Sequence, residues 1–460
     1  MHYRLLLFLF FISNGNVFSQ NWQEIGNGIN DAPTCMFEDT TNDIVYFGGW
    51  FRVIDGDSIS GIASYNGTTF YQLGGGLNPF ADVKTIVKFN NEIYAAGNIL
   101  TAEGKSVHNI VRWNGFEWDS VGPGFNNIVN KLEIINNELY ACGVFDSSGT
   151  LAVNGLAKWD GNSWQSVFNF PNLWSSINNN YVLGICEYHG ELYVGGNFDN
   201  DTISDIIKYN GTNWVNVGGG MHGGMSGIEK MAIYDDKLIV AGAFYLQDGN
   251  AGNFIQQWDG NTWSDVGGGF LGYGMQLYSN GQVHGLTVYK DKLYACGVFS
   301  YAGGVPAQKI AKWDGVKWCG IGSAINNRIY SCGFFRDTLY ISCGFSIIDG
   351  DSIKGIAKWL GGDYVDTCSA VGIHEVYFDK ENLLLYPNPA QSTLTISFPE
   401  SYAIKTGTTY KIVDKLGREI KSGKMETSSF SLSVEDLPVG LYVIIVQGDS
   451  FIEQRKFVKE

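Results

Sequence analysis

One phrase recurs along the middle of this 460-residue chain, and its clearest copy occupies residues 191–218. The phrase contains an apolar-Gly-Gly segment, a Tyr or Trp, and a second aromatic residue about five positions later. Its first part ends at Phe51, Ile99, Phe145, Phe198, Phe244, Phe299 and Phe345. Its period of 46 to 55 residues is typical of solenoids, propellers and arrays, so the repeat limits the possible folds before any other feature.

One copy, residues 131–168, shows what each unit forms. Apolar alternation predicts strands over 131–135, 139–145, 156–159 and 164–167, and Asp160-Gly161 is a hairpin turn signal. Four antiparallel strands at this period describe a propeller blade. A solenoid is the alternative, but its terminal repeats should resemble caps, and these do not. We therefore predict an all-β chain with a seven-bladed β-propeller.

The last aromatic of the phrase occurs eight times for seven units. The positions are Trp22, Phe70, Trp118, Trp164, Trp214, Trp263, Trp318 and, as a poor match, Tyr364. Trp22 belongs to a strong fourth-strand match with no blade before it. We therefore expect the N-terminal strand to complete the last blade and close the ring.

The order Gly-Gly, then Tyr or Trp, then Trp resembles the kelch repeat of galactose-oxidase-like propellers over residues 21–366. The pattern departs from that repeat in its short Asp/Asn-Gly turns. Gly-Gly itself is intact only at Gly48-Gly49 and Gly195-Gly196. The resemblance implies a blade fold and leaves the subfamily open.

Composition agrees with a β-rich exported chain. Glycine numbers 60 and proline only 9, while charged residues make up 17% with a formal net charge of −16. This excess of acidic groups argues against a nucleic-acid partner, because phosphates select Lys and Arg patches. The acidity lies in the middle region, since residues 383–460 hold nine basic and nine acidic residues.

The two ends are predicted to direct export. Arg4 followed by the apolar run 5–12 resembles a signal peptide, which we place at residues 1–19. No later segment is long and apolar enough for a transmembrane helix. We assign the propeller to residues 20–366, a linker to 367–382 and a small β-sandwich to 383–460.

The sandwich carries four motifs: Tyr386-Pro387-Asn388-Pro389-Ala390, the turn 414–418, the step 437–442 and the terminal Lys456-Phe457-Val458-Lys459. Together they resemble the C-terminal sorting domain of the type IX secretion system of Bacteroidetes. That resemblance implies a Sec signal followed by type IX secretion, with the secretion machinery as a partner. It also implies a secreted or cell-surface location. A carbohydrate-binding sandwich is the alternative.

Strand alternation places the blade-to-blade loops and the second-to-third loops on one face, here called the long-loop face. The turns of the opposite, short-turn face are too tight for a ligand, and function usually lies in long loops. Candidate ligand-binding residues on the long-loop face are Trp174, Tyr181, His222, Phe270, Tyr273, Tyr278 and His284. Aromatic rings beside amides suit sugars or peptide side chains. Alternatively, these aromatic residues pack the loops themselves.

Metal and covalent chemistry have weaker sequence signals. Asp55 and Asp57, with the matching pair Asp349 and Asp351, are calcium candidates, but Asp-Gly is also an ordinary turn. His222 and His284 would be the candidates for a copper pair on the long-loop face. The triple-glycine runs have no following helix and predict turns, not phosphate loops. No other cofactor is expected.

Eight cysteines in an exported chain allow disulfides. Cys142 and Cys296 occupy equivalent positions in distant blades, so we expect them to be buried thiols. Cys319, Cys332 and Cys343 cluster at the last blade, where a bridge would support closure.

These observations favour an exported recognition module that binds a glycan or protein through its long-loop face. A secreted polysaccharide-active hydrolase, lyase or oxidase with a site on the same face is the alternative. A structural repeat protein without a ligand is a third possibility. No catalytic residue is assigned, because neither paired carboxylates nor a metal cluster is visible on that face.

Overall fold

The structure is a computed structural model that divides into two compact units, one containing the strands from β1 to β35 and one containing β36 to β42. The described residues are 22–168, 170–171, 181–199, 204–221, 226–272, 281–322, 325–348, 351–360, 383–398, 408–414, 418–425, 427–447 and 452–460. The predicted signal peptide and linker lie outside these ranges. Among the described residues, no helix is long and apolar enough to cross a membrane.

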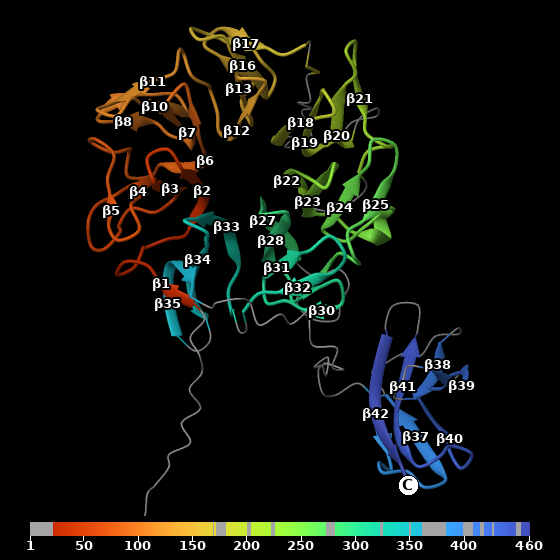
Figure 1. Ribbon diagram of the computed structural model, residues 1–460. Helices are drawn as coiled ribbons and strands as arrows, with labels where there is room; N and C mark the ends of the chain where they lie inside the picture. Colours follow the sequence, from red (N-terminus) through yellow and green to blue (C-terminus); the bar gives the residue numbers. More distant parts are fainter. Residues whose placement is uncertain are drawn as a thin grey trace, which may run out of the picture. The chain divides into compact units, whose positions relative to one another are not determined.

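The first unit is a β-propeller, and its described residues form seven four-stranded antiparallel sheets arranged in a ring (Figure 1). The innermost strands are β2 (Pro33–Asp39), β6 (Asp82–Phe89), β12 (Val129–Ile135), β18 (Tyr181–Tyr188), β22 (Ser226–Tyr234), β27 (Gln282–Tyr289) and β33 (Ile329–Phe335). The second strands are β3 (Ile44–Gly49), β7 (Glu92–Asn98), β13 (Glu138–Gly143), β19 (Glu191–Asp199), β23 (Lys237–Ala243), β28 (Lys292–Val298) and β34 (Thr338–Ile348).

The outer half of each sheet carries the aromatic residues of the repeat. Third strands are β4 (Ile62–Tyr65), β10 (Ile110–Trp113), β16 (Leu156–Trp159), β20 (Ser204–Tyr209), β24 (Ile255–Trp258), β31 (Ile310–Trp313) and β35 (Asp351–Trp359). Fourth strands are β5 (Phe70–Tyr71), β11 (Trp118–Ser120), β17 (Trp164–Ser166), β21 (Trp214–Asn216), β25 (Trp263–Asp265), β32 (Trp318–Gly320) and β1 (Trp22–Glu24). The four strands predicted within 131–168 are confirmed as β12, β13, β16 and β17.

The expected closure of the ring is confirmed. The N-terminal strand β1 pairs antiparallel with β35, with Trp22 opposite Trp359 and Glu24 opposite Ala357. The first and last described strands of the propeller therefore belong to one sheet. At this point backbone hydrogen bonds close the ring.

Fourth-strand tryptophans link neighbouring sheets. The indole Nε1 of Trp118 donates to the Leu73 carbonyl at 3.0 Å, and that of Trp318 donates to the Val266 carbonyl at 2.8 Å. The same bond recurs for Trp164, Trp214 and Trp263. Each acceptor lies just after the fourth strand of the preceding sheet. The repeated tryptophan therefore satisfies its own buried N–H while fastening one blade to the next.

The glycine after the fourth strand is required by the same packing. Gly218 has φ of +58°, and a Cβ there would lie 2.5 Å from the ring of Trp258. In one blade the glycine is replaced by Phe168, which stacks at 4.5 Å on Tyr209, where most other blades carry a tryptophan. A larger residue is therefore accepted where the facing ring is smaller.

Four further hairpin strands and a short helix cover the long-loop side. They are β8 (Thr101–Ala102) with β9 (Lys105–Ser106), β14 (Ser147–Ser148) with β15 (Leu151–Ala152), and the 3-10 helix η1 (Leu246–Asp248). A three-stranded sheet joins β26 (Phe270–Leu271), β29 (Tyr301–Ala302) and β30 (Val305–Pro306). These second-to-third loops pair with the exit of the preceding blade, as Leu77 does with Ala102.

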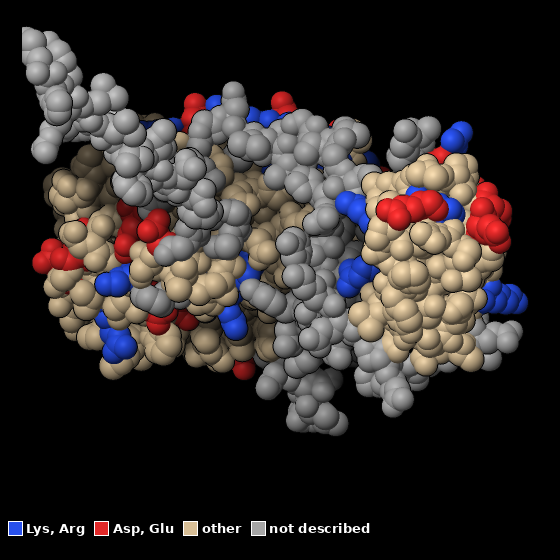
Figure 2. Space-filling view, turned by 90° about the horizontal axis from the view of Figure 1, so that it is seen from below, with Lys and Arg blue, Asp and Glu red and all other residues tan. Residues whose placement is uncertain are grey.

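The second unit is a β-sandwich with its own core. One sheet contains β36 (Leu384–Tyr386), β37 (Thr393–Ser397) and β40 (Ser429–Ser433), and the other contains β38 (Thr409–Asp414), β39 (Glu419–Lys424), β41 (Gly440–Gln447) and β42 (Ile452–Lys459). Leu394, Ile412 and Ile444 are completely buried between them. Acidic and basic side chains are interspersed on its surface, as Figure 2 shows, which agrees with the neutral charge predicted for this region.

The first and last motifs of the sandwich lie against each other. The Asn388 side chain accepts the Val458 N–H at 2.8 Å and donates to the Lys456 carbonyl at 3.2 Å. Ala390 N–H donates to the Val458 carbonyl at 2.8 Å. The Tyr-Pro-Asn-Pro-Ala segment and the terminal Lys-Phe-Val-Lys strand are therefore one structural feature.

Candidate functional site

The centre of the ring is bordered by seven innermost strands that share one irregularity. Each has a β-bulge near its start, where the chain enters from the long-loop face. A bulge re-aims the side chain that loses its strand partner, and bulges often lie beside functional sites. One residue without a register partner from each strand belongs to what is here called the bulge ring: Thr34, Lys84, Asn130, Leu183, Glu229, His284 and Tyr330. In β22 a second register shift also leaves Gly227 without a partner.

The bulges also explain the Gly-Gly part of the repeat. A Cβ on Gly143 would overlap the carbonyl of Ile128, and a Cβ on Gly196 would overlap that of Tyr181. The innermost strand therefore lies against the second strand at the point where its register shifts. Glycine is the residue that allows this close approach.

These strands are the innermost of the ring in Figure 1, and charged side chains on two of them are partly exposed. The Lys84 side chain is 35% exposed and that of Lys131 is 42% exposed. Lys84 pairs with Asp82 at 2.7 Å, and Lys131 pairs with Glu133 at 2.9 Å. Water therefore reaches charged groups on the innermost strands, and the space that these strands surround is here called the channel.

Three neighbouring blades contribute a continuous polar arc. His284 Nδ1 lies 3.3 Å from Glu229 Oε2, and Gln282 donates its side-chain amide to the other oxygen of Glu229. The His284 ring stacks on Tyr330 with centroids 6.0 Å apart. His284 and Glu229 are only 15% and 17% exposed. Among the described residues, the buried Nε2 of His284 has no hydrogen-bond partner. We call Glu229, Gln282, His284 and Tyr330 the polar arc.

Two of the predicted ligand-binding residues lie at this channel mouth. Tyr181 begins β18, one residue before its bulge pair, and His284 belongs to the polar arc. Trp174, His222, Tyr273 and Tyr278 lie outside the described residues. Four members of the channel were missed: Lys131, Glu229, Lys230 and Tyr330. They could have been found as polar residues at two adjacent repeating positions near the start of each first strand.

Phe270 has a different surrounding from the one predicted. Its side chain is completely buried, stacks on Phe299 at 4.5 Å and contacts Trp318 at 4.7 Å. Phe125 stacks on Phe145 in the same way at an equivalent position. Phe270 thus packs its own loop, as the alternative interpretation of these aromatics predicts, and has no surface to offer a ligand.

The opposite face is less closed than the sequence predicts. A cavity of about 310 Å³ lies where the last blade meets the first, lined in part by Gly67, Arg336, Lys358 and Trp359. No hairpin turn joins β35 to β1, because β1 comes from the other end of the chain, and this accounts for the space. Arg336 is already engaged by Asp43 at 2.6 Å.

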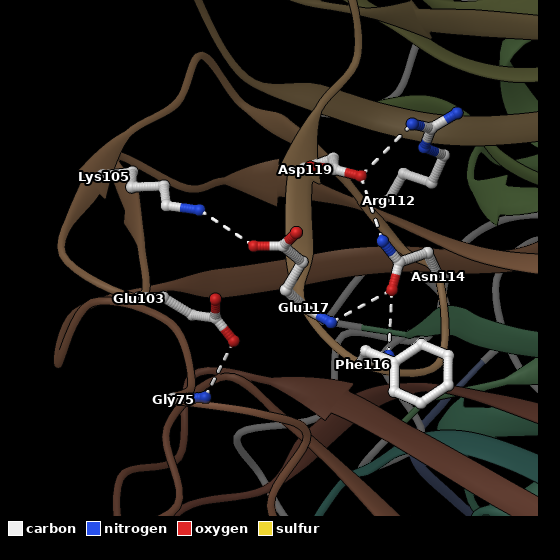
Figure 3. A network of polar contacts seen from close by, with 8 residues as sticks. All are labelled: Gly75, Glu103, Lys105, Arg112, Asn114, Phe116, Glu117 and Asp119. Carbon is white, nitrogen blue, oxygen red and sulfur yellow. Dashed lines mark hydrogen bonds and ion pairs between the residues drawn. The ribbon is translucent and has the colours of Figure 1, made fainter.

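The outer edge of one blade carries a polar network that stabilises its hairpins (Figure 3). Asn114 accepts the backbone N–H groups of Phe116 and Glu117, and Lys105 pairs with Glu117 at 3.1 Å. Arg112 pairs with Asp119 at 3.2 Å. Figure 3 also shows Glu103 accepting the backbone N–H of Gly75 at 2.9 Å, so the network extends from the hairpins of this blade to the exit of the preceding one.

The described residues test the calcium hypothesis only in part. Asp57 N–H donates to the Ile54 carbonyl at 2.8 Å within a turn, and Asp349 lies outside the described residues. Within the described ranges, no group of three His, Cys, Asp or Glu side chains could hold a metal ion.

Cys142 and Cys296 are buried free thiols, as predicted. Cys319 is disulfide-bonded, whereas Cys332 and Cys343 are free, so these two do not supply the bridge expected at the last blade. In Cys343, burial raises the pKa of the thiol to about 11.

Comparison with known proteins identifies the second unit. Residues 384–460 match the family model described as a secretion system C-terminal sorting domain. This match supports export through type IX secretion to the cell surface or the medium. No curated protein matches the chain.

Solved structures show only distant likeness. PorZ, a surface component of the type IX secretion system of Porphyromonas gingivalis, is 11% identical with a TM-score of 0.39, over 91% of this chain and 64% of that one. The extracellular domain of the putative hybrid two-component system BT4673 from B. thetaiotaomicron is 12% identical with a TM-score of 0.48, over 95% and 58%. The Niastella koreensis GH74 enzyme is 11% identical with a TM-score of 0.42, over 95% and 67%. The chain spans less than two thirds of the first two, and the kelch resemblance stays a prediction.

Proposed function

We propose that this protein is an exported recognition module whose seven-bladed, kelch-like propeller binds a glycan or protein at the channel mouth of its long-loop face. The observation that carries the proposal is the polar arc, in which a carboxylate, an amide, an imidazole and a phenol from neighbouring blades converge beside a solvent-accessible channel. Such mixed groups beside an aromatic ring suit hydroxyl-bearing ligands. The sorting domain would direct the protein to the cell surface or the medium, where hydroxyl-bearing ligands would be accessible to it.

A glycan array probed with the full chain tests this proposal. We expect binding to a defined subset of glycans, and we expect Glu229→Ala to reduce it by at least about tenfold, because a hydrogen bond to a charged group contributes roughly 1.5–3 kcal/mol. The matched control Glu117→Ala removes a carboxylate from the outer edge of a blade and should leave binding unchanged. Uniform non-binding on the array would refute the glycan version of the proposal.

A second candidate function, a polysaccharide-active enzyme, is supported by one feature. Glu229 contacts Nδ1 of His284, and Nε2 of the same ring has no hydrogen-bond partner among the described residues. A histidine that acts as a general base is often oriented by a carboxylate in this way. Release of reducing ends from an array-positive polysaccharide by the wild type and not by His284→Ala would favour this function over simple binding.

A further inference from the structure

Two lysines occupy the same register position in different blades. Lys131 and Lys230 each follow the bulge directly, opposite Cys142 in β13 and Ala241 in β23. The equivalent residues of the other innermost strands are Cys35, Thr85, Gly184, Gly285 and Ser331. Equivalent register means equivalent depth in the channel, so two lysines share a level at which none of the seven innermost strands carries an acidic residue.

The blade that follows each lysine carries a glycine at this register position. Gly184 stands at this position in the blade after Lys131, and Gly285 stands there in the blade after Lys230. A Cβ on Gly285 would lie 2.5 Å from the Cys296 sulfur, and the charge of Lys230 lowers the pKa of that thiol against the larger effect of burial. The Lys230 charge therefore lies close enough to Cys296, beside Gly285, to act on its thiol.

The two lysines differ in how their charges are balanced. Lys131 is paired with Glu133 at 2.9 Å. Among the described residues, the ammonium of Lys230 has no hydrogen bond or ion pair, because its neighbour Glu229 is engaged by Gln282 and His284. Burial and the charge of Lys131 lower the pKa of Lys230, although Glu229 opposes them. An unpaired ammonium in a confined site is costly unless an anion joins it.

We propose that the channel binds the carboxylate of an acidic sugar between Lys230 and Lys131, with the polar arc holding the sugar's hydroxyl groups. This inference rests on the proposed glycan-binding function and names its ligand class. The net charge of −16 would repel an extended polyanion. The ligand is therefore a chain end that presents a single uronate to the channel, and not a stretch of uniformly charged polymer.

Isothermal titration of the full chain with glucuronate, glucose and acetate tests the inference, because the sugars differ in one carboxylate and acetate lacks the sugar. We expect glucuronate to bind at least about tenfold more tightly than either, since a charge-assisted hydrogen bond contributes roughly 1.5–3 kcal/mol. Lys230→Met should bring glucuronate to the affinity of glucose. Lys230→Arg should preserve the preference, and the matched control Lys105→Met should change nothing.

The outcomes separate the two proposals. Equal affinity for glucose and glucuronate, or an unchanged preference in a folded Lys230→Met protein, would overturn the carboxylate site and leave glycan binding standing. Acetate binding as tightly as glucuronate would overturn the role of the sugar. Failure of all three ligands together with a blank glycan array would remove both proposals. If Lys230→Met does not fold, Lys131→Met gives the same comparison from the other side of the channel.

Discussion

Trp22 and Trp359 pack edge to face, with ring centroids 4.9 Å apart and planes inclined by 75°. The equivalent pairs Trp113–Trp118 and Trp159–Trp164 lie within a single continuous hairpin at 5.4 and 5.1 Å. At the closing blade the two rings come from opposite ends of the propeller sequence. The N-terminal strand therefore supplies the aromatic residue that the seventh sheet would otherwise lack.

Removal of this closing pair should destabilise the propeller strongly. Trp22→Ala is expected to cost roughly 3–5 kcal/mol, as for other buried tryptophans, and deletion of residues 21–28 should lower the melting temperature sharply. Tryptophan fluorescence reports this unit selectively, because all 13 tryptophans lie at or before Trp359. An unchanged melt after the deletion would refute closure by β1.

Substitutions at Gly218 and Gly219 should distinguish the cost of backbone strain from the cost of a steric clash. Gly218→Ala places a methyl group against Trp258 and Trp263, whereas a Cβ at Gly219 would meet nothing within 4 Å. Both have positive φ, so both substitutions carry backbone strain. We expect Gly218→Ala to be the more destabilising by about 1–3 kcal/mol in urea unfolding. Equal costs would show that the tryptophan contact is unimportant.

A buried ion pair should make the propeller sensitive to acid. Burial alone would raise the pKa of Asp39, but hydrogen bonds from Lys88 at 2.8 Å and from Asn42 outweigh it and lower the pKa. A lowered carboxyl pKa stabilises the fold above the ordinary aspartate value of about 3.9 and loses that contribution as the pH falls through the folded value. Asp39→Asn should therefore cost roughly 3–5 kcal/mol at pH 7, with the difference from wild type shrinking below about pH 4. A pH-independent difference would contradict this assignment.

Among the described cysteines, thiol labelling should distinguish the disulfide-bonded Cys319 from six free thiols. Burial raises the pKa of Cys35 to about 12, and Cys142 is completely buried. Because the thiolate is the reactive form, iodoacetamide should label these sites slowly in the native protein and readily after unfolding. Mass spectrometry should find Cys319 labelled only after reduction. Labelling of Cys319 without reductant would show that its disulfide is absent.

The sequence repeat was sufficient to predict the blades, because the turn glycines and the paired tryptophans mark strand ends at fixed intervals. The pairing of Trp22 with Trp359 could likewise be predicted from the surplus aromatic alone. The polar arc was harder to predict, since Glu229 and His284 are 55 residues apart and meet only through the bulges of two strands. Bulges shift register by one residue, and a plain alternation pattern does not reveal them.

Phe270 illustrates the opposite difficulty. An aromatic residue in a glycine-rich loop is typical of a binding surface and equally of a loop anchor. Its equivalence to Phe125, which packs on Phe145 as Phe270 packs on Phe299, decides for the anchor. That equivalence becomes evident only after the exits of the fourth strands are aligned in space.

Hydrogen–deuterium exchange of the full chain, with and without a glycan found on the array, tests the central claim most directly. Binding at the channel mouth predicts ligand-dependent protection in β22 and β27, which carry Glu229, Lys230, Gln282 and His284. The short-turn segments 66–69 and 114–117 should exchange equally in both states. Protection confined to those turns or to the sandwich strands, with β22 and β27 unchanged, would contradict recognition through the channel.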